Sequence, residues 1–301
     1  SILGDLIANL LRDDGTVRVL MGPGVDPHGY EASAADAAAI RDAELVVANG
    51  LLLEDGLIAT LEAAEADGVR VLSIAEKLDP IPFGADSHDD HDDDHDDDHE
   101  GDKHEDDDGD DHDDDHDEHG DEDPHFWWDP MRTMTAVELI AAELTDLRPE
   151  IDWAARAAAY NAQILEVHEG LLTLFATIPA ERRSIITNHD ALGYLAVAYD
   201  FEVIGTVIPG ASTMAATNPQ AFARLIDLVV AEGVDVIFAE NTDSTVLAEQ
   251  LASEAVGRGD VRLQVVRLYT DALGGPGSGA ETYLGMLRTT ATLITEALAS
   301  A

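Results

Sequence analysis

The stretch Asp123-Pro124-His125-Phe126-Trp127-Trp128-Asp129-Pro130 decides how the chain is interpreted. It sets one histidine among three aromatic rings and two prolines, which restrict the backbone and favour burial. The segment that leads into it, 86–123, alternates histidine with aspartate and offers no apolar side chain to a core. We therefore predict one rigid metal site that contains His125, supplied by a loosely ordered acidic segment.

The charge of the chain points to cations as partners. The 301 residues carry a formal net charge of −47, and 45% of them are hydrophobic, which suffices for two ordinary domains. The segment 86–123 holds 25 acidic residues and one lysine, so the rest of the chain still has a net charge of −23. Such a surface argues against nucleic acid and anionic membranes as partners.

The sequence contains no cysteine, which removes disulfides and thiolate metal sites from consideration. It has no apolar run of the ~18–20 residues that cross a membrane, and no secretory signal pattern at its start. The abrupt beginning at residues 1–5 suggests a processed or trimmed N-terminus. We expect a location in the periplasm or on the outer face of the cytoplasmic membrane, as a secreted protein with or without a lipid anchor.

Short apolar runs alternate with helical patterns along the chain, which predicts βαβ units and parallel sheets. In the first half the expected strands are 17–21, 45–48 and 69–73, and the expected helices are 4–12, 33–41 and 57–66. In the second half the expected strands are 184–187, 201–205, 234–239 and 263–268, and the expected helices are 219–232 and 281–298.

Between the halves, a helical pattern at 152–177 is about 37 Å long at the usual rise per residue. The predicted fold class is therefore α/β, with two lobes that each have a mainly parallel sheet flanked by helices, one long spine helix joining them, and a metal site in the cleft between lobes. The expected domains are an N-terminal lobe (1–148, with 86–123 disordered), a linker helix (149–178) and a C-terminal lobe (179–301).

Side chains that bind metals fall where such a fold would gather them. In open α/β sheets, ligands bind beyond the carboxyl ends of the strands. His28, His189, Glu240 and Asp271 each follow an expected strand, and His125 lies in the aromatic stretch. Three imidazoles and one carboxylate, from His28, His125, His189 and Asp271, suit Zn²⁺ in a four-coordinate site. Glu240 is assigned as a hydrogen-bond acceptor for an imidazole N–H.

Each of these residues also has an ordinary structural interpretation. A single histidine in a loop more often forms a surface or hydrogen-bonding contact than a metal bond. Asp271 would serve as a turn or helix cap, and Glu240 would pair with an arginine. The joint placement favours the metal site, because three of the four histidines outside the acidic segment occur at strand ends or in rigid loops. The fourth, His168, lies inside the long helix and is interpreted as structural.

The acidic segment is predicted to capture metal as an auxiliary element. Its first four histidines are three or four residues apart, but aspartate is a poor helix former and like charges at that spacing repel. We expect disorder without metal and weak, multiple binding with it; the alternative is a solvated acidic spacer. The auxiliary residues are His88, His91, His95, His99, His104, His112, His116 and His119.

Several motifs together resemble those of zinc/manganese solute-binding proteins, the metal-receptor (cluster A-I) components of bacterial ABC importers. The resemblance covers nearly the whole chain, with the motifs in the order of the family. They are Asp26-Pro27-His28-Gly29-Tyr30-Glu31, Ala48-Asn49-Gly50-Leu51 with Leu53-Glu54, Pro124 to Pro130, Thr187-Asn188-His189-Asp190-Ala191, Pro209-Gly210-Ala211-Ser212, Phe238-Ala239-Glu240 and Thr282-Tyr283-Leu284.

The resemblance implies two α/β lobes joined by one long helix, with the metal between them. The ligand positions of the family fall on His28, His125, His189 and Asp271. Members that resemble manganese receptors usually carry glutamate at the third position, so His189 favours zinc. A histidine-rich loop ahead of the second ligand is typical of zinc members, and here it is longer and richer in aspartate. The strand that the family has ahead of residues 1–5 is mostly missing from the sequence.

The predicted function is high-affinity capture of Zn²⁺ and delivery to a membrane permease, not catalysis. The expected partners are the ABC-transporter permease and, as a further candidate, a periplasmic metallochaperone; we expect a monomer that binds no nucleic acid. The alternatives are a manganese receptor of the same family and a zinc-dependent hydrolase with Glu240 as general base. A third is a metal-buffering or adhesion protein in which the acidic segment is the whole function.

Overall fold

The computed structural model describes residues 1–84, 122–208, 210, 212–215, 218–242, 244–258 and 263–300. The eight histidines predicted to form an auxiliary metal-capturing element therefore lie outside the described residues. The two ends of this gap are adjacent, since Pro82 pairs with Glu122 as an isolated antiparallel bridge and the backbone N–H of Asp123 donates to the carbonyl of Ile81.

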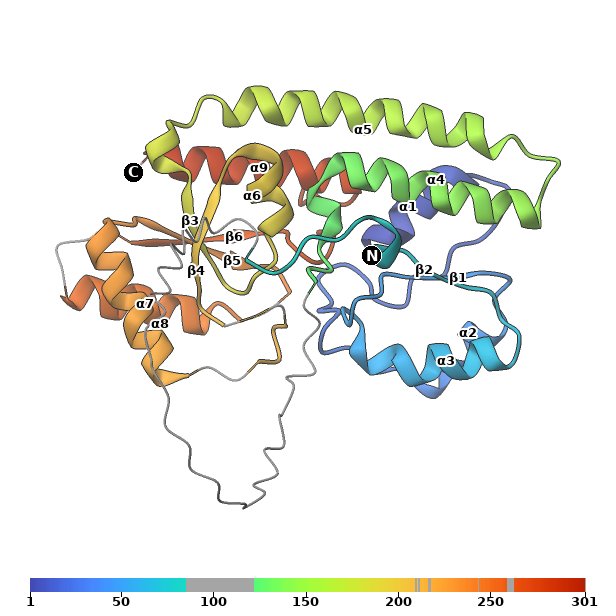
Figure 1. Ribbon diagram of the computed structural model, residues 1–301, viewed down its shortest axis with the longest axis horizontal. Coiled ribbons are helices and arrows are strands. Elements are labelled where there is room, and N and C mark those ends of the chain that lie inside the picture. The colour runs from blue at the N-terminus through green and yellow to red at the C-terminus, as the bar shows by residue number, and fades with distance from the viewer. Residues whose placement is uncertain are drawn as a thin grey trace, which may run out of the picture.

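The N-terminal lobe is built on a two-stranded parallel sheet of β1 (Val46–Ala48) and β2 (Val71–Ser73). Helices lie on both sides of this sheet (Figure 1). On one side are α1 (Ile2–Leu11) and α4 (Pro130–Leu147), and on the other are α2 (Ala34–Arg41) and α3 (Ile58–Ala66). The start of α2 is fixed locally, because Ser33 and Asp36 form a reciprocal capping box.

The strand predicted at 17–21 is wrong, since these residues have no regular secondary structure. A strand needs a hydrogen-bonded neighbour to satisfy its backbone groups. Residues 17–21 instead line a cavity of about 560 Å³ together with α1 and β1, so they lie along β1 without pairing with it. Their side chains are partly or largely exposed, and Val19 is 44% exposed.

The C-terminal lobe contains a four-stranded, all-parallel sheet in the order β4-β3-β5-β6. Its strands are β3 (Ser184–Thr187), β4 (Glu202–Thr206), β5 (Val236–Glu240) and β6 (Gln264–Leu268). Its helices are α6 (Gly193–Tyr199), α7 (Pro219–Glu232), α8 (Val246–Arg258) and α9 (Tyr283–Ser300). The sequence did not predict α6 or α8.

Alternate residues of the central strands face two different cores. Ile185 and Phe238 belong to a large core that includes residues of α5, α6 and α9. Their neighbours Ile186 and Ile237 belong to a second core formed with α7 and α8. This follows from the two-residue period of a strand, and burial on both faces explains why these strands read as continuous apolar runs.

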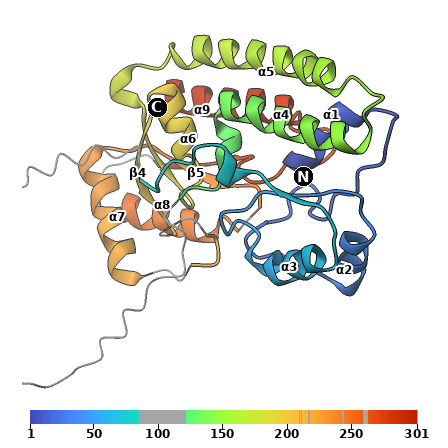
Figure 2. The same ribbon diagram turned by 45° about the vertical axis from the view of Figure 1, so that its right-hand side comes forward.

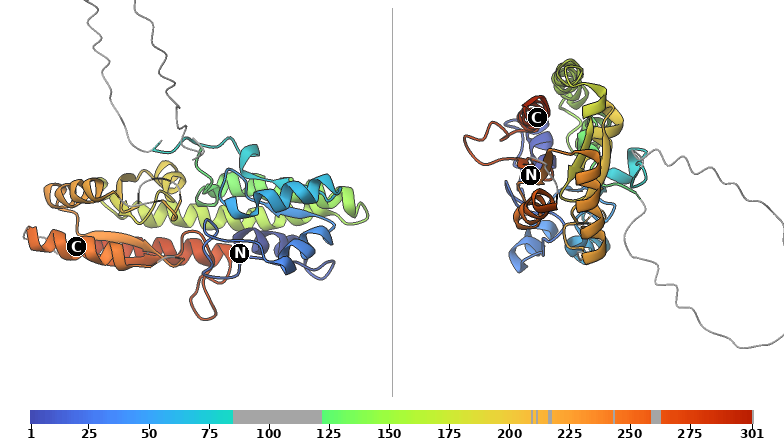
Figure 3. Two further views of the ribbon diagram at one scale, coloured as in Figure 1. Left: turned by 90° about the horizontal axis from the view of Figure 1, so that it is seen from below. Right: turned by 90° about the vertical axis from the view of Figure 1, so that its left-hand side faces the viewer.

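The long helix α5 (Trp153–Phe175) begins where the Asp152 side chain accepts the backbone N–H of Ala155. Figures 1 and 2 show α4 and α9 beneath it, in the N-terminal and C-terminal halves respectively, and the view from below in Figure 3 shows α5 along most of the long axis. Nδ1 of His168 in this helix lies 2.9 Å from the Tyr199 hydroxyl, and this contact is structural. Two lobes with parallel sheets and one crossing helix confirm the predicted fold class.

One core passes through both lobes. It contains buried side chains of α1 and α4 from the N-terminal lobe, of α5, and of β3, β5, β6 and α9 from the C-terminal lobe. The lobes are therefore packed against each other by the same close-packed interior that stabilises each of them.

Among the helices that the structure describes, none is both long and apolar enough to cross a bilayer.

Candidate metal centre

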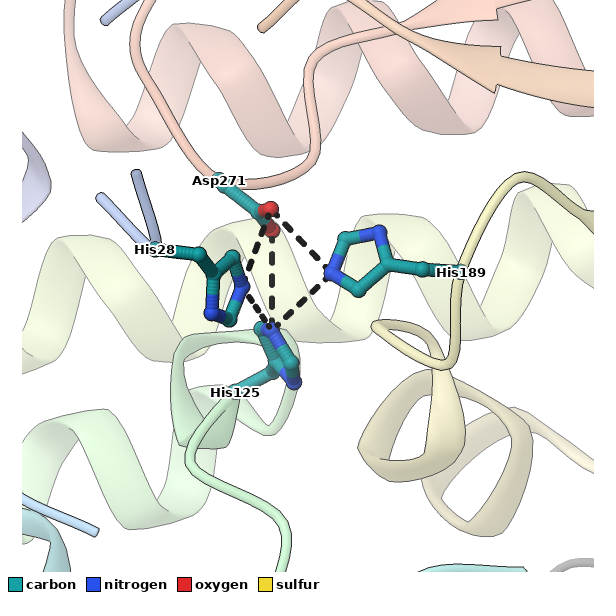
Figure 4. A group of neighbouring side chains, drawn as sticks. All are labelled: His28, His125, His189 and Asp271. Atoms are coloured by element: carbon teal, nitrogen blue, oxygen red, sulfur yellow. Dashed lines mark hydrogen bonds and ion pairs between the residues drawn. The ribbon is translucent and has the colours of Figure 1, made fainter. Parts of the chain in front are cut away.

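Four buried side chains converge between the two lobes. His28, His125, His189 and Asp271 each offer one ligand atom, and these atoms all lie within 4.8 Å of one another. Figure 4 shows the three imidazoles and the carboxylate pointing toward a common centre, each from a different segment of the chain. The structure thus brings together the four residues that the sequence predicts as ligands.

The separations between these atoms are short and similar. Nε2 of His125 lies 3.4 Å from Nε2 of His28 and 3.4 Å from Nε2 of His189. The carboxylate of Asp271 lies 3.3 Å from Nε2 of His189, 3.7 Å from that of His28 and 3.9 Å from that of His125. All three histidines therefore present the same ring nitrogen to the centre.

The C-terminal lobe supplies its residues from the carboxyl edge of its sheet. His189 follows β3, Glu240 is the last residue of β5, and Asp271 follows β6, and these three strands are neighbours. This arrangement follows the rule that parallel sheets bind ligands at their carboxyl ends. His28 differs from the prediction, because it reaches the site from the loop between α1 and α2 rather than from the end of a strand.

In the N-terminal lobe, the same tripeptide holds both ligand loops. Asp26-Pro27-His28 and Asp123-Pro124-His125 each place an aspartate two residues before the histidine. In each, the aspartate Oδ1 accepts the backbone N–H of the histidine, at 2.9 Å for His28 and 2.8 Å for His125. The roles of Asp26 and Asp123 were not predicted from the sequence, although the repeated Asp-Pro-His pattern is a signal for such a turn.

Carboxylates also orient two of the imidazole rings from behind. Asp123 Oδ1 lies 2.7 Å from Nδ1 of His125, and Glu240 Oε1 contacts Nδ1 of His189. Glu240 Oε1 also accepts the backbone N–H of His189. A carboxylate on Nδ1 keeps the proton there and leaves Nε2 free to bind a metal, an arrangement common around metal-bound histidines.

Trp127 links ligands that come from different lobes. Its ring packs edge-on against His125, with ring centroids 5.3 Å apart. Its Nε1 donates to the carbonyl of Thr270 at 2.7 Å, next to Asp271. The Tyr283 hydroxyl in turn donates to the Trp127 carbonyl. The aromatic stretch therefore holds His125 in place, as its composition predicts, and also fixes the segment that carries the fourth side chain.

The electrostatics of the site favour a bound cation. Burial, followed by repulsion from neighbouring imidazoles, lowers the pKa of His28 to about 2 and that of His125 well below its ordinary value. Burial also lowers the pKa of His189, but Glu240 and Asp271 outweigh it and raise that pKa to about 10. Burial raises the pKa of Asp271 well above its ordinary value. In a site without water, one bound cation would stabilise the unprotonated imidazoles and the ionised carboxylate together.

Among the described residues, Asp271 lies within ion-pair distance of the three imidazoles of the site, at 3.3 to 3.9 Å from their Nε2 atoms. Both of its carboxylate oxygens are buried and accept no hydrogen bond from the part of the chain that the structure describes. A buried carboxylate without a donor is costly, and it is rare unless it is paired or binds a metal. The three Nε2 atoms around it carry lone pairs, so a divalent cation at the centre would satisfy all four side chains.

Residues 1–297 match the family described as Zinc-uptake complex component A periplasmic, or ZnuA. The chain belongs to this family. ZnuA proteins are metal-binding solute receptors of ABC import systems, so the chain is a receptor and not an enzyme. The hydrolase alternative fails with this assignment, and Glu240 is already engaged by His189. A membrane permease is accordingly the partner of the import system, and the periplasmic family description agrees with the expected location outside the cytoplasm.

Proteins similar to this chain are named for different metals. The manganese-binding lipoprotein MntA of Halalkalibacterium halodurans is 28% identical over 96% of this chain and 83% of its own. The zinc-binding protein TroA of Treponema pallidum is 27% identical over 99% of this chain and 86% of its own. The solved structure of TroA superposes with a TM-score of 0.81, covering 99% of this chain and 96% of that one at 27% identity.

A manganese-bound structure is similar as well. The periplasmic metal-binding protein of Candidatus Liberibacter asiaticus matches with a TM-score of 0.75 at 26% identity, over 99% of this chain and 97% of that one. These likenesses confirm the two-lobed α/β architecture and the binding of a divalent metal. The metal names are divided between zinc and manganese.

Proposed function

We propose that the protein is a zinc receptor that binds Zn²⁺ through His28, His125, His189 and Asp271. The observation that carries this proposal is the spacing of the four ligand atoms. In a tetrahedron the distance between two ligand atoms is about 1.63 times the metal–ligand distance, so zinc–nitrogen bonds of about 2.0–2.1 Å require about 3.3–3.4 Å between ligands. The two 3.4 Å separations from His125 to the other histidines, and the 3.3 to 3.9 Å between each Nε2 and an oxygen of Asp271, lie at or slightly above that value. One ligand atom from each of the four residues lies within 4.8 Å of the others.

The donor set favours zinc over manganese. Three neutral imidazoles and one carboxylate suit a borderline-soft ion, whereas Mn²⁺ prefers oxygen ligands in an octahedral arrangement. His189 supplies nitrogen at the position where a carboxylate would favour manganese. Among the residues that the structure describes, Asp271 is the one acid in the cluster of converging side chains, because Glu240 faces Nδ1 of His189 from behind. Manganese remains the alternative cargo, supported by the name of the MntA relative.

Capture, transport and delivery follow from a closed ligand shell. Four protein ligands leave no open position for the water that a zinc hydrolase activates, so the ion is held as cargo and passed unchanged to the permease. The acidic segment, whose histidines lie outside the described residues, is proposed to concentrate zinc near the site. Its 25 acidic residues would attract divalent cations at long range.

A matched pair of histidine variants tests the ligand assignment. The His189→Ala variant removes one ligand atom, while His168→Ala removes a histidine that contacts only Tyr199 among its described partners. We expect calorimetry with Zn²⁺ and with Mn²⁺ to show one tight zinc site in the wild type and in His168→Ala. In His189→Ala that site should be weakened at least 100-fold, while weak binding by the acidic segment persists.

Metal analysis of the protein purified without added metal gives a second measurement. We expect about one tightly held zinc per chain after weakly bound metal has been removed by desalting. Tighter binding of Mn²⁺ than of Zn²⁺ would overturn the zinc assignment and leave the receptor function. Equal zinc affinity in His189→Ala and in the wild type would overturn the four-residue site itself.

A further inference from the structure

A loop of the C-terminal lobe reaches across to the N-terminal lobe beside the metal centre. Residues 212–215 lie against residues 26–29, and the Thr213 hydroxyl donates a 2.6 Å hydrogen bond to Oδ2 of Asp26. Both side chains are partly buried, and the residues are 187 positions apart in the chain. This contact is separate from the apolar core that joins the lobes, because neither residue belongs to that core.

The acceptor of this hydrogen bond is tied to a proposed ligand. While Oδ2 of Asp26 binds Thr213, Oδ1 of the same carboxylate accepts the backbone N–H of His28 at 2.9 Å. Asp26 therefore connects the backbone of His28 to the opposite lobe through two oxygens of one rigid group. Separation of Thr213 from Asp26 would remove this link and leave the hydrogen bond between Asp26 and His28 in place.

The other end of the crossing loop is anchored beside a second proposed ligand. The backbone N–H of Asp190 donates to the carbonyl of Gly210 at 3.2 Å, and Asp190 directly follows His189. Gly210 thus contacts the His189 segment, and Thr213, three residues later, contacts the His28 segment. The loop spans the two histidines that approach the centre from different lobes.

The side chain of Met214 also approaches Gly29. A Cβ atom placed on Gly29 would lie 3.2 Å from the sulfur of Met214, tighter than ordinary packing. Met214 is largely exposed on its outer side. Thr213 and Met214 therefore contact both ends of the 26–29 segment.

We propose that the Thr213–Asp26 hydrogen bond is a latch that slows release of the bound metal ion. The proposal rests on the proposed function and adds the residue that controls the lifetime of the complex. Thr213 is a positioning residue, because it acts on His28 through Asp26 and touches no ligand atom. A hydrogen bond to a charged acceptor is stronger than one between neutral groups, and its short length agrees with that. Because the lobes are already joined by their core, loss of the latch should loosen the site without unfolding the protein.

Two substitutions at one position test the latch in the full chain. Thr213→Val keeps the shape of the side chain and removes the hydroxyl, while Thr213→Ser keeps the hydroxyl and removes a methyl group. The protein is loaded with one equivalent of Zn²⁺, desalted, and mixed with an excess of chelator in a stopped-flow instrument. The measured quantities are the rate of zinc release, the rate of zinc association and the melting temperature of the metal-free protein.

We expect Thr213→Val to release zinc about tenfold faster than the wild type, the size expected when a hydrogen bond to a charged group is lost. Thr213→Ser should release it at nearly the wild-type rate. Association rates should stay within about twofold, because affinity changes within one site fall mainly on dissociation. The melting temperature of the metal-free protein should fall by only a few degrees in Thr213→Val, as expected for one lost hydrogen bond, and stay near the wild-type value in Thr213→Ser.

Two results would overturn the latch. The first is a release rate in Thr213→Val that matches the wild type. The second is equally fast release in Thr213→Val and Thr213→Ser, which would assign the effect to packing. Both leave the proposed function intact, because the wild type still holds zinc tightly in a site that His189→Ala destroys. A wild-type chain without any tightly held zinc would remove the receptor proposal and the latch together.

Discussion

Oδ1 of Asp123 lies 2.7 Å from Nδ1 of His125, on the side of the ring opposite the nitrogen that faces the metal centre. The same oxygen accepts the backbone N–H of His125 at 2.8 Å. One buried carboxylate atom therefore sets both the backbone and the ring of a proposed ligand. Burial raises the pKa of Asp123 to about 7, because the ionised carboxylate is poorly solvated there. A nearby cation would lower the free energy of the ionised form.

We expect Asp123→Asn to weaken zinc binding by about 10- to 100-fold, the usual effect of removing a carboxylate behind a metal-bound histidine. The amide has lost the negative charge that makes the ring a better donor, and it can present an N–H group to Nδ1 in place of an acceptor. The measurement is competition for Zn²⁺ against a chromophoric chelator of known affinity.

Asp152→Asn is the matched control for the lost charge. Asp152 caps α5 away from the metal centre, and asparagine is an equally good cap. Its zinc affinity should equal that of the wild type. Equal affinity in Asp123→Asn and Asp152→Asn would show that the contact between Asp123 and His125 contributes nothing to binding.

Zinc binding is expected to release about one proton per ion at pH 8. Without metal, the carboxylates of Glu240 and Asp271 outweigh burial and raise the pKa of His189 to about 10, so this ring is protonated at pH 8. Nε2 must lose its proton before it can bind zinc, so metal and proton compete. At pH values below that pKa, the apparent affinity should therefore rise about tenfold for each unit of increase in pH. It should fall correspondingly as the solution becomes more acidic.

Calorimetry in two buffers with different ionisation enthalpies measures the released protons directly. The Glu240→Gln variant identifies their source. Without the Glu240 charge, burial lowers the pKa of His189, so the metal-free ring becomes neutral and proton release should decrease. Unchanged release in Glu240→Gln would assign the proton to another group.

The sequence predicts the fold wherever local patterns and packing agree. Strand 184–187 and helix 219–232 have the predicted bounds, because both are limited by polar residues or proline next to a regular apolar pattern. Helix α6 was missed because its seven residues begin with glycine and are set almost wholly by burial in the core. Segment 17–21 has the composition of a strand, but the pairing that would form one depends on a neighbour that local sequence cannot specify.

For the site, the carboxyl-end rule predicted the positions of His189 and Asp271, and the aromatic stretch predicted that of His125. His28 was selected by residue type, from the end of a strand that does not form. The supporting contacts were not predicted, because they depend on residues that meet only after folding. Thr213 meets Asp26 from the other lobe, and Trp127 donates to the carbonyl of Thr270. A backbone carbonyl has no sequence signature, and a threonine in a loop is too common to indicate a contact. The repeated Asp-Pro-His tripeptide is the one supporting feature with a sequence signal, since it marks both histidine turns of the N-terminal lobe, but it was not used to predict them.

Deletion of residues 86–121 should reduce the number of zinc ions bound per chain without weakening the tightest one. The deletion is feasible because the flanking residues are already adjacent, with Pro82 paired to Glu122 and Asp123 bonded to Ile81. A short glycine-serine linker from Ala85 to Glu122 would close the gap. Calorimetry with Zn²⁺ on the wild type and the deletion gives both the number of ions and the affinity.

Combining the deletion with His189→Ala supplies the control, and this double variant should bind no zinc tightly. Loss of tight binding on deletion alone would support the view that the acidic segment is the whole metal-binding function. Unchanged stoichiometry after deletion would instead reduce the segment to a solvated spacer, even if the four-residue site remains.

Small-angle scattering should give the same profile for the metal-free and the zinc-bound protein. Hinge closure in two-lobed receptors requires an interface that can open, but here one close-packed core contains side chains from both lobes and from α5. Opening it would expose residues such as Leu6 and Tyr283, which are fully buried. Metal release must then proceed through local loops, and Thr213→Val should speed it while leaving the scattering profile unchanged. A large change of shape on zinc binding would show that the lobes rotate despite their shared core.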